Sequence, residues 1–191
     1  MRADDVLAEF EAAGGLLRGH FILTSGRHSD TYLNKSAIAQ YPERCARLCA
    51  ALAAKIETAV GGADVIVSPA LGAIVFGYET AKTLGARFFF LERDGEGFAL
   101  RRGYAFKPGE RVVIVEDIIS TGLSARACVK AVEAAGAEPL ALACLINRSG
   151  GGANVGAPVL ALTELSIPTY APDETPETLR AIPAVKPGSR A

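Results

Sequence analysis

A buried strand that runs into two acidic residues and then a small-residue turn most constrains how this chain can fold. The stretch 111–115 is mostly β-branched, which predicts a buried strand. Glu116 and Asp117 come next, and the turn 120–124, with the sequence Ser-Thr-Gly-Leu-Ser, opens the following helix. A strand that passes through a short turn into a helix is typical of a parallel sheet covered by helices.

The turn 120–124 also has the chemistry of an anion-binding site. Backbone N–H groups at a helix start, together with the helix dipole, favour a phosphate there. The hydroxyls of Ser120, Thr121 and Ser124 supply further donors, and Gly122 allows a close backbone approach. The neighbouring carboxylates suit sugar hydroxyls or a magnesium ion. The segment therefore predicts a cradle for a phosphorylated sugar, the alternative being a strand end that only caps a helix.

Strands and helices alternate along the rest of the chain. Helices are predicted at 4–13, 42–60, 73–84 and 125–135, strands at 65–67, 87–91, 111–115, 140–146 and 159–165, and a short hairpin within 16–37. This order predicts an α/β fold with a parallel sheet and helices on both faces. Residues 1–183 are expected to form a single domain, and 184–191 a disordered tail.

Composition argues against several classes of partner. A net charge of −1 gives no basic field for nucleic acid or for an acidic membrane. No stretch reaches membrane-spanning length and the N-terminus has no apolar signal core, so we expect a cytoplasmic protein. The cysteines at 45, 49, 128 and 144 are expected to be buried and reduced, although Cys45 and Cys49, four residues apart, could in principle face a metal.

Three further segments are predicted to lie at the C-terminal ends of the strands, where such sheets bind ligands. The small-residue turn 68–73 could hold a second anion. The charged stretch 92–103 is long enough for a mobile lid, and its arginines suit phosphate oxygens. Arg148, after the strand 140–146, can reach a carboxylate ligand. The ordinary alternatives are a plain strand-to-helix turn, a solvated loop and a surface arginine.

The motif at 111–124 resembles the phosphoribosyl pyrophosphate signature of type I phosphoribosyltransferases. That signature has an apolar strand, two acids, two apolar residues and a Thr/Ser-x-Gly-x-Ser/Thr turn, and Leu123 occupies a place that is commonly small or polar. The segment 19–34, with its Ser-Gly-Arg core, is similar to bacterial orotate phosphoribosyltransferases. Three more segments, 68–72, 100–103 and 147–148, match that family in the same order.

The resemblance implies a type I phosphoribosyltransferase fold, with a hood made mainly of 1–37 and part of 150–183 over a core of about 38–149. It also implies Mg²⁺-dependent transfer of a 5-phosphoribosyl group from phosphoribosyl pyrophosphate to orotate, giving orotidine 5'-phosphate and pyrophosphate in UMP biosynthesis. The Mg²⁺ would be held mainly by substrate and water, with no direct protein ligand. A homodimer with shared active sites is expected, without nucleic-acid or membrane partners.

Carried over residue by residue, the resemblance implies three sets of site residues. Phosphoribosyl pyrophosphate would contact Glu116, Asp117, Ile118, Ile119, Ser120, Thr121, Gly122, Leu123, Ser124, Arg93, Ala70, Leu71, Gly72 and Ala73. Orotate would contact Ser120, Arg148, Tyr32 and Leu33. The catalytic residues would be Glu116, Asp117, Arg101 and Arg102.

The two catalytic arginines are substitutes for a lysine that longer members of the family carry in the mobile loop. Here no lysine or histidine lies between Glu92 and Tyr104, as in a short-loop subgroup, so the usual catalytic lysine cannot be named. Thr24 also stands where some members have lysine.

Two alternative functions stay open at the level of sequence. A phosphoribosyltransferase for another nucleobase would keep the motif 116–124, but would explain neither the N-terminal match nor Arg148. A non-enzymatic regulator that senses phosphoribosyl pyrophosphate should present a basic face to nucleic acid, which the net charge of −1 disfavours.

Overall fold

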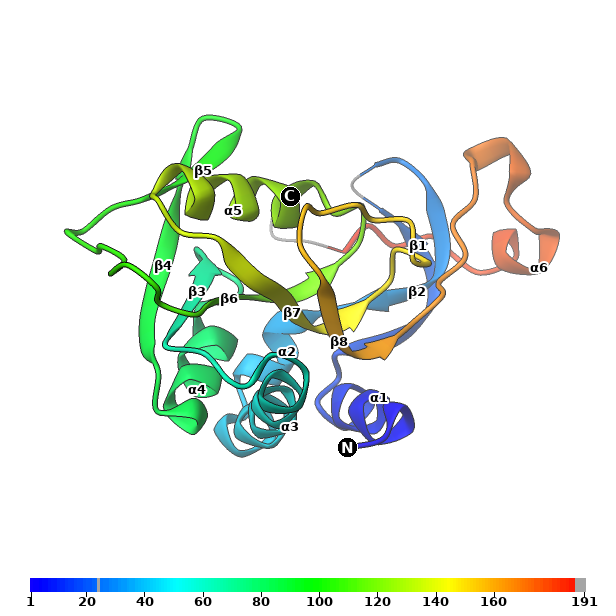
Figure 1. The fold of residues 1–191 in the computed structure, drawn as a ribbon. Helices are drawn as coiled ribbons and strands as arrows, with labels where there is room; N and C mark the ends of the chain where they lie inside the picture. The colour runs from blue at the N-terminus through cyan, green and yellow to red at the C-terminus, as the bar shows by residue number, and fades with distance from the viewer. Residues whose placement is uncertain (24, 188–191) are drawn as a thin grey trace.

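The computed structural model describes residues 1–23 and 25–187, which build a six-stranded sheet with helices on both faces and a separate two-stranded hairpin (Figure 1). The strand order in the large sheet is β5-β4-β3-β6-β7-β8, and only β5 runs antiparallel to its neighbour. These strands are β3 (Val65–Pro69), β4 (Arg87–Asp94), β5 (Gly97–Leu100), β6 (Val112–Ile119), β7 (Pro139–Asn147) and β8 (Val159–Glu164). The predicted α/β architecture is confirmed.

Helices cover the two faces of the sheet unequally (Figure 1). One face carries α1 (Ala3–Ala12), α3 (Pro42–Val60) and α4 (Ile74–Leu84), and the other carries α5 (Leu123–Ala134). The remaining helices are short: α2 (Lys35–Ala39), the 3₁₀ turn η1 (Pro172–Glu174) and α6 (Glu177–Arg180). None of the helices in the described part of the chain combines the length and apolar character needed to cross a bilayer.

Helix α3 shows how the sequence dictates these elements. Pro42 occupies its first turn, where a missing N–H costs nothing, and Gly61 ends it in the left-handed conformation with φ of 73°. Its buried side chains form a stripe that packs on the sheet: Cys45, Leu48, Cys49, Leu52, Ala53 and Ile56. All four cysteines are free and buried, as predicted.

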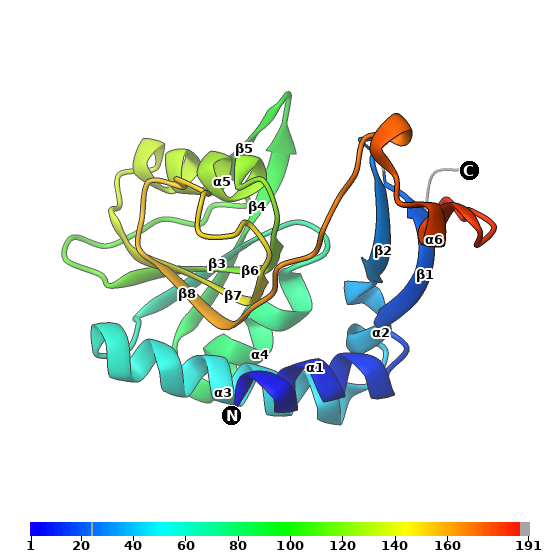
Figure 2. The same cartoon turned by 90° about the vertical axis from the view of Figure 1, so that its right-hand side faces the viewer.

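The hairpin consists of β1 (Leu16–Ile22) and β2 (His28–Leu33), paired antiparallel, and stands apart from the large sheet (Figure 2). A segment near the C-terminus packs on it, because His28 and Tyr170 exchange backbone hydrogen bonds. The N–H of Val185 donates to the His20 carbonyl at 2.8 Å. The prediction of a disordered tail was therefore wrong at Val185. Residues 188–191 of that predicted tail, and Thr24, lie outside the described residues.

Two predicted segments differ in extent from the observed ones. Strand β6 does not end before the acidic residues, because β7 is long enough to pair with it up to Ile119. The stretch 92–103, predicted to be long enough for a mobile lid, has regular structure over most of its length, and its mobility stays a prediction. It forms a β4–β5 hairpin that turns at Gly95, with φ of 56°, since Phe98 gains burial in the cluster beneath α5.

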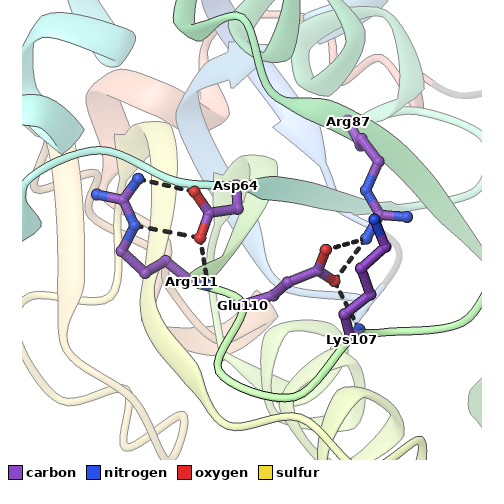
Figure 3. A network of polar contacts seen from close by, with 5 residues as sticks. All are labelled: Asp64, Arg87, Lys107, Glu110 and Arg111. Atoms are coloured by element: carbon purple, nitrogen blue, oxygen red, sulfur yellow. Dashed lines mark hydrogen bonds and ion pairs between the residues drawn. The ribbon is translucent and has the colours of Figure 1, made fainter.

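Paired charges link the N-terminal ends of three strands of the large sheet (Figure 3). Arg111, just before β6, donates to both carboxylate oxygens of Asp64, and these hydrogen bonds lower the pKa of Asp64 to about 2. Glu110 accepts from Arg87 at 2.5 Å and from the Lys107 N–H at 2.7 Å. The network ties together the starts of β3, β4 and β6.

Candidate active site

The crevice between the C-terminal ends of β3 and β6 is the topological switch point of the sheet. From β3 the chain proceeds to β4 on one side and later returns to β6 on the other. The last β3–β6 register pair is Val67 with Ile114, whereas β6 continues beside β7 to Ile119. The end of β6 thus lies open toward the loop that follows β3, and open α/β sheets bind their ligands at such a place.

The two acidic residues of β6 point to opposite sides of the strand, as successive strand residues do. Glu116 accepts a hydrogen bond from the Ser124 hydroxyl at 2.8 Å, on the side of α5. Asp117 lies on the other side, beside Lys35 and the loop after β3. The carboxylates of Glu116 and Asp117 therefore do not converge on one ligand position, because they face different sides of β6 and contact different residues.

Glu116 is 6% exposed, and its oxygens are occupied by Ser124 and by the N–H of Asp117 at 3.2 Å. Burial, and secondly the charge of Asp117, raise the pKa of Glu116 to about 7. Near neutral pH a large fraction of Glu116 is consequently uncharged, so it can lie beside an anion without strong repulsion.

Asp117 forms an ion pair with Lys35 that sequence reasoning missed. Lys35 is the first residue of α2, and its Nζ lies 2.5 Å from Oδ2 of Asp117. Oδ1 accepts from the Ile118 N–H at 2.6 Å. Oδ2 is buried and has no directed hydrogen bond within the described residues, despite its proximity to Lys35. It can therefore accept a hydrogen bond from a ligand hydroxyl.

Gly72 closes this part of the site. A Cβ atom at that position would lie 2.7 Å from Nζ of Lys35 and 2.8 Å from Oδ2 of Asp117, closer than real Cβ contacts. The absence of a side chain at Gly72 thus lets the loop 70–73 lie directly against the ion pair. Nothing in the local sequence around Lys35 indicated this meeting of three distant segments.

The turn after β6 forms a pocket of about 70 Å³ at the start of α5. It is lined by Glu116, Ile118, Ile119, Ser120, Thr121, Gly122, Leu123, Ser124 and Ala125. Gly122 has φ of 79°, and a Cβ there would lie 2.9 Å from Cβ of Ala153, so glycine is required on two grounds. The turn predicted to bind an anion therefore lines a concavity, with the helix start and hydroxyl groups on its wall.

The three arginines of the predicted lid contact groups of their own hairpin. The guanidinium of Arg93 lies 4.4 Å from the ring centre of Phe98. Arg101 pairs with Asp94 at 3.1 Å, and Arg102 with Glu92 at 2.5 Å. No hydrogen bond or ion pair among the described residues joins these arginines to the crevice. The catalytic roles of Arg101 and Arg102 and the donor contact of Arg93 stay predictions.

Arg148 lies beside the end of β6, since its N–H donates to the Ile119 carbonyl at 2.8 Å. Its side chain is half-buried and has no carboxylate partner among residues 1–23 and 25–187, and burial lowers its pKa. Tyr32 packs on Phe21 with ring centres 5.7 Å apart. The Leu33 side chain is buried in the core, which leaves only its backbone for a ligand.

Comparison with known proteins agrees with this geometry. A family model described as phosphoribosyl transferase domain matches residues 35–171. The chain is 56% identical over 192 residues to an orotate phosphoribosyltransferase of a Methylobacterium species, and 53% identical over 190 residues to one of Caulobacter vibrioides. Both alignments cover 100% of this chain and 98% of the relative. The solved orotate phosphoribosyltransferase of Aeropyrum pernix shares the fold, with a TM-score of 0.69 at 19% identity over 84% of this chain and 93% of that one.

Proposed function

The chain belongs to the phosphoribosyl transferase domain family, and we propose that it transfers a 5-phosphoribosyl group from phosphoribosyl pyrophosphate to orotate. The products are orotidine 5'-phosphate and pyrophosphate, and the reaction serves pyrimidine biosynthesis in the cytoplasm. The observation that carries the proposal is the buried Oδ2 of Asp117, without a directed hydrogen bond in the described structure, in the same crevice as a helix-start pocket.

The donor is held by the two loops at the switch point. Its 5-phosphate binds in the pocket 120–124, where N–H groups and hydroxyls converge and the neutral form of Glu116 avoids charge repulsion. A ribose hydroxyl donates to Asp117, whose negative charge stabilises the positive charge that develops on the sugar. The pyrophosphate lies against the N–H groups of the loop 70–73. Catalysis is then mainly a matter of positioning and charge.

Orotate is bound at the other end of the crevice by Arg148, whose half-buried guanidinium has no carboxylate partner in the described part of the chain. In a bidentate contact, the negative carboxylate of orotate would compensate the half-buried positive charge of the Arg148 guanidinium. The hydroxyl of Ser120 and the backbone of Leu33 complete this subsite, and Tyr32 borders it. Arg148 thereby selects an acidic pyrimidine over a neutral nucleobase.

The site fits a Mg²⁺ ion that is held through the substrate rather than by the protein. Within the described residues, no group of three or more His, Cys, Asp or Glu side chains could hold a metal. Glu116 is occupied by Ser124, and Asp117 lies beside the cation of Lys35. Asp117 would face the ion through ribose oxygens or water, and the bound ion would neutralise charge on the pyrophosphate.

The hood consists of the β1–β2 hairpin and the segment near the C-terminus that packs on it. Its contacts include Ser29 Oγ donating to the Pro168 carbonyl at 2.9 Å, besides the backbone pairing at Tyr170. The core, 38–149, supplies the crevice, and α2 connects the two. We place both within one domain, 1–183.

The partner is a second copy of the chain. Leu71, Val75 and Tyr78 are 84%, 43% and 57% exposed, and their spacing puts them on one face of the loop and helix α4. An exposed apolar stripe beside an active-site loop supports a homodimer in which this face is buried and the β4–β5 hairpin reaches the neighbouring site.

A direct assay tests the proposed reaction. The purified protein is incubated with phosphoribosyl pyrophosphate, Mg²⁺ and either orotate or adenine, and nucleotide and pyrophosphate are measured together. We expect equal amounts of orotidine 5'-phosphate and pyrophosphate with orotate, and no nucleotide with adenine. Turnover with adenine alone would indicate a purine enzyme, and donor binding without turnover would indicate a sensor.

A further inference from the structure

Lys35 occupies the point where the two parts of the proposed donor site meet. Its Nζ lies 2.5 Å from Oδ2 of Asp117, which faces the proposed ribose position. The same Nζ lies against Gly72, in the loop proposed for pyrophosphate. The bond that breaks in the reaction joins the ribose to the pyrophosphate, so the ammonium group of Lys35 would be adjacent to both sides of that bond in a donor bound as proposed.

The ion pair is unequal in burial, and this decides which partner can move. The Asp117 side chain is 2% exposed and is fixed by its hydrogen bond from the Ile118 N–H. The Lys35 side chain is 44% exposed and carries four rotatable bonds, so it can swing while Asp117 stays in place. If the Lys35 side chain swings away, Oδ2 is left free to accept a hydrogen bond from an incoming hydroxyl.

A pyrophosphate at loop 70–73 needs a nearby cation, since it would otherwise lie close to the charge of Asp117. Within one subunit, the hairpin arginines Arg101 and Arg102 are paired with Asp94 and Glu92. Lys35, in contrast, is already in contact with the loop.

We propose that Lys35 is a donor-binding residue that leaves Asp117 and pairs with the pyrophosphate group when phosphoribosyl pyrophosphate binds. In the free protein Lys35 compensates the buried charge of Asp117. In the complex its ammonium group donates to a pyrophosphate oxygen, and Oδ2 of Asp117 accepts from a ribose hydroxyl. This inference rests on the proposed function, because it assumes that the crevice binds that donor.

The rival explanation is that Lys35 only attaches the hairpin segment to the core. Separate binding of the two halves of the donor distinguishes these roles. Mg²⁺-pyrophosphate and ribose 5-phosphate are titrated calorimetrically into the full-length wild type and into Lys35→Met. Methionine is unbranched and nearly as long as lysine but carries no charge. The control is Lys82→Met, which removes an exposed lysine that pairs with Glu79 on the surface of α4.

We expect Lys35→Met to weaken Mg²⁺-pyrophosphate binding at least about tenfold, the effect of losing one hydrogen bond between charged groups. Ribose 5-phosphate binding should change less than about threefold, since its phosphate is held at 120–124. Lys35→Arg should recover part of the pyrophosphate affinity, and Lys82→Met should match the wild type. Unchanged pyrophosphate affinity, or equal loss for both ligands together with a lower melting temperature, would overturn the proposal.

Gly72→Ala tests the same contact without altering charge. Its added Cβ would lie within 2.7 Å of Lys35 Nζ and 2.8 Å of Asp117 Oδ2, so the pair must separate. We expect weaker pyrophosphate binding with ribose 5-phosphate binding retained, and an unchanged pyrophosphate affinity would count against the proposal. These readouts need no nucleobase. If orotate is not consumed but the Lys35 dependence is observed, the acceptor assignment fails while the donor inference stands.

Discussion

Replacing Glu116 with glutamine should change how the stability of the protein depends on pH. Burial and the charge of Asp117 raise the pKa of Glu116 from an ordinary value of 4.5 to about 7. Between these two values the unfolded chain releases a proton that the folded protein retains. The free energy of unfolding of the wild type therefore falls as pH rises through this window. The destabilisation caused by ionising the buried Glu116 is fully present above about pH 7.

The size of the effect follows from the difference between the two pKa values. At 1.36 kcal/mol for each pKa unit, the upward change of about 2.5 corresponds to about 3 kcal/mol, of which about 2 to 3 kcal/mol should appear between pH 5 and pH 8. Glutamine can accept the hydrogen bond from Ser124, but its amide cannot replace both carboxylate oxygens. A pH-independent loss of about 1 kcal/mol is thus expected as well.

Urea unfolding of both proteins at several pH values between 5 and 8 measures this difference. Titrating groups that the two proteins share cancel when their unfolding free energies are subtracted. The free energy of unfolding of Glu116→Gln minus that of the wild type should rise with pH and level off near pH 8. Glu133→Gln, which removes an exposed carboxylate from α5, is the control for losing one surface charge. Parallel pH curves for Glu116→Gln and the wild type would refute the argument that the buried carboxylate resists ionisation.

Three further predictions concern activity. Asp117→Asn should lower kcat at least about tenfold, or roughly 1.4 kcal/mol of transition-state stabilisation, with the fold intact by circular dichroism; unchanged turnover at saturating substrate would remove Asp117 from the mechanism. Arg148→Ala should raise KM for orotate far more than KM for the donor, because the orotate carboxylate loses its cation, whereas equal effects would indicate a structural arginine. Mixing Asp117→Asn with Arg101→Ala or Arg102→Ala should restore part of the activity if hairpins act across a dimer. Heterodimers confirmed by native mass spectrometry, yet no more active than either parent, would show that the hairpin serves its own subunit or that neither arginine is catalytic.

Local sequence was sufficient for the features whose causes are local. The start of α3 at Pro42 and its end before Gly61 follow from backbone constraints at those two residues. The pocket at 120–124 follows from a strand, a glycine with positive φ and hydroxyl groups within one short segment. The motif also carried the family assignment, since its residue types and spacing are specific enough to be recognised without coordinates.

Other features of the fold and the site depend on pairing between segments far apart in the chain. Local sequence patterns do not predict such pairing. The extension of β6 to Ile119 depends on the length of β7, and the order of Val185 depends on a backbone partner in β1. Lys35 meets Asp117 only because α2, β6 and the loop at Gly72 converge at the switch point. The altered proton affinity of Glu116 likewise arises from burial beneath α5, which is a property of the packed molecule. The sequence by itself determined which chemical groups the site contains, whereas the tertiary structure decided which groups touch and what charge they carry, because both depend on distance and desolvation.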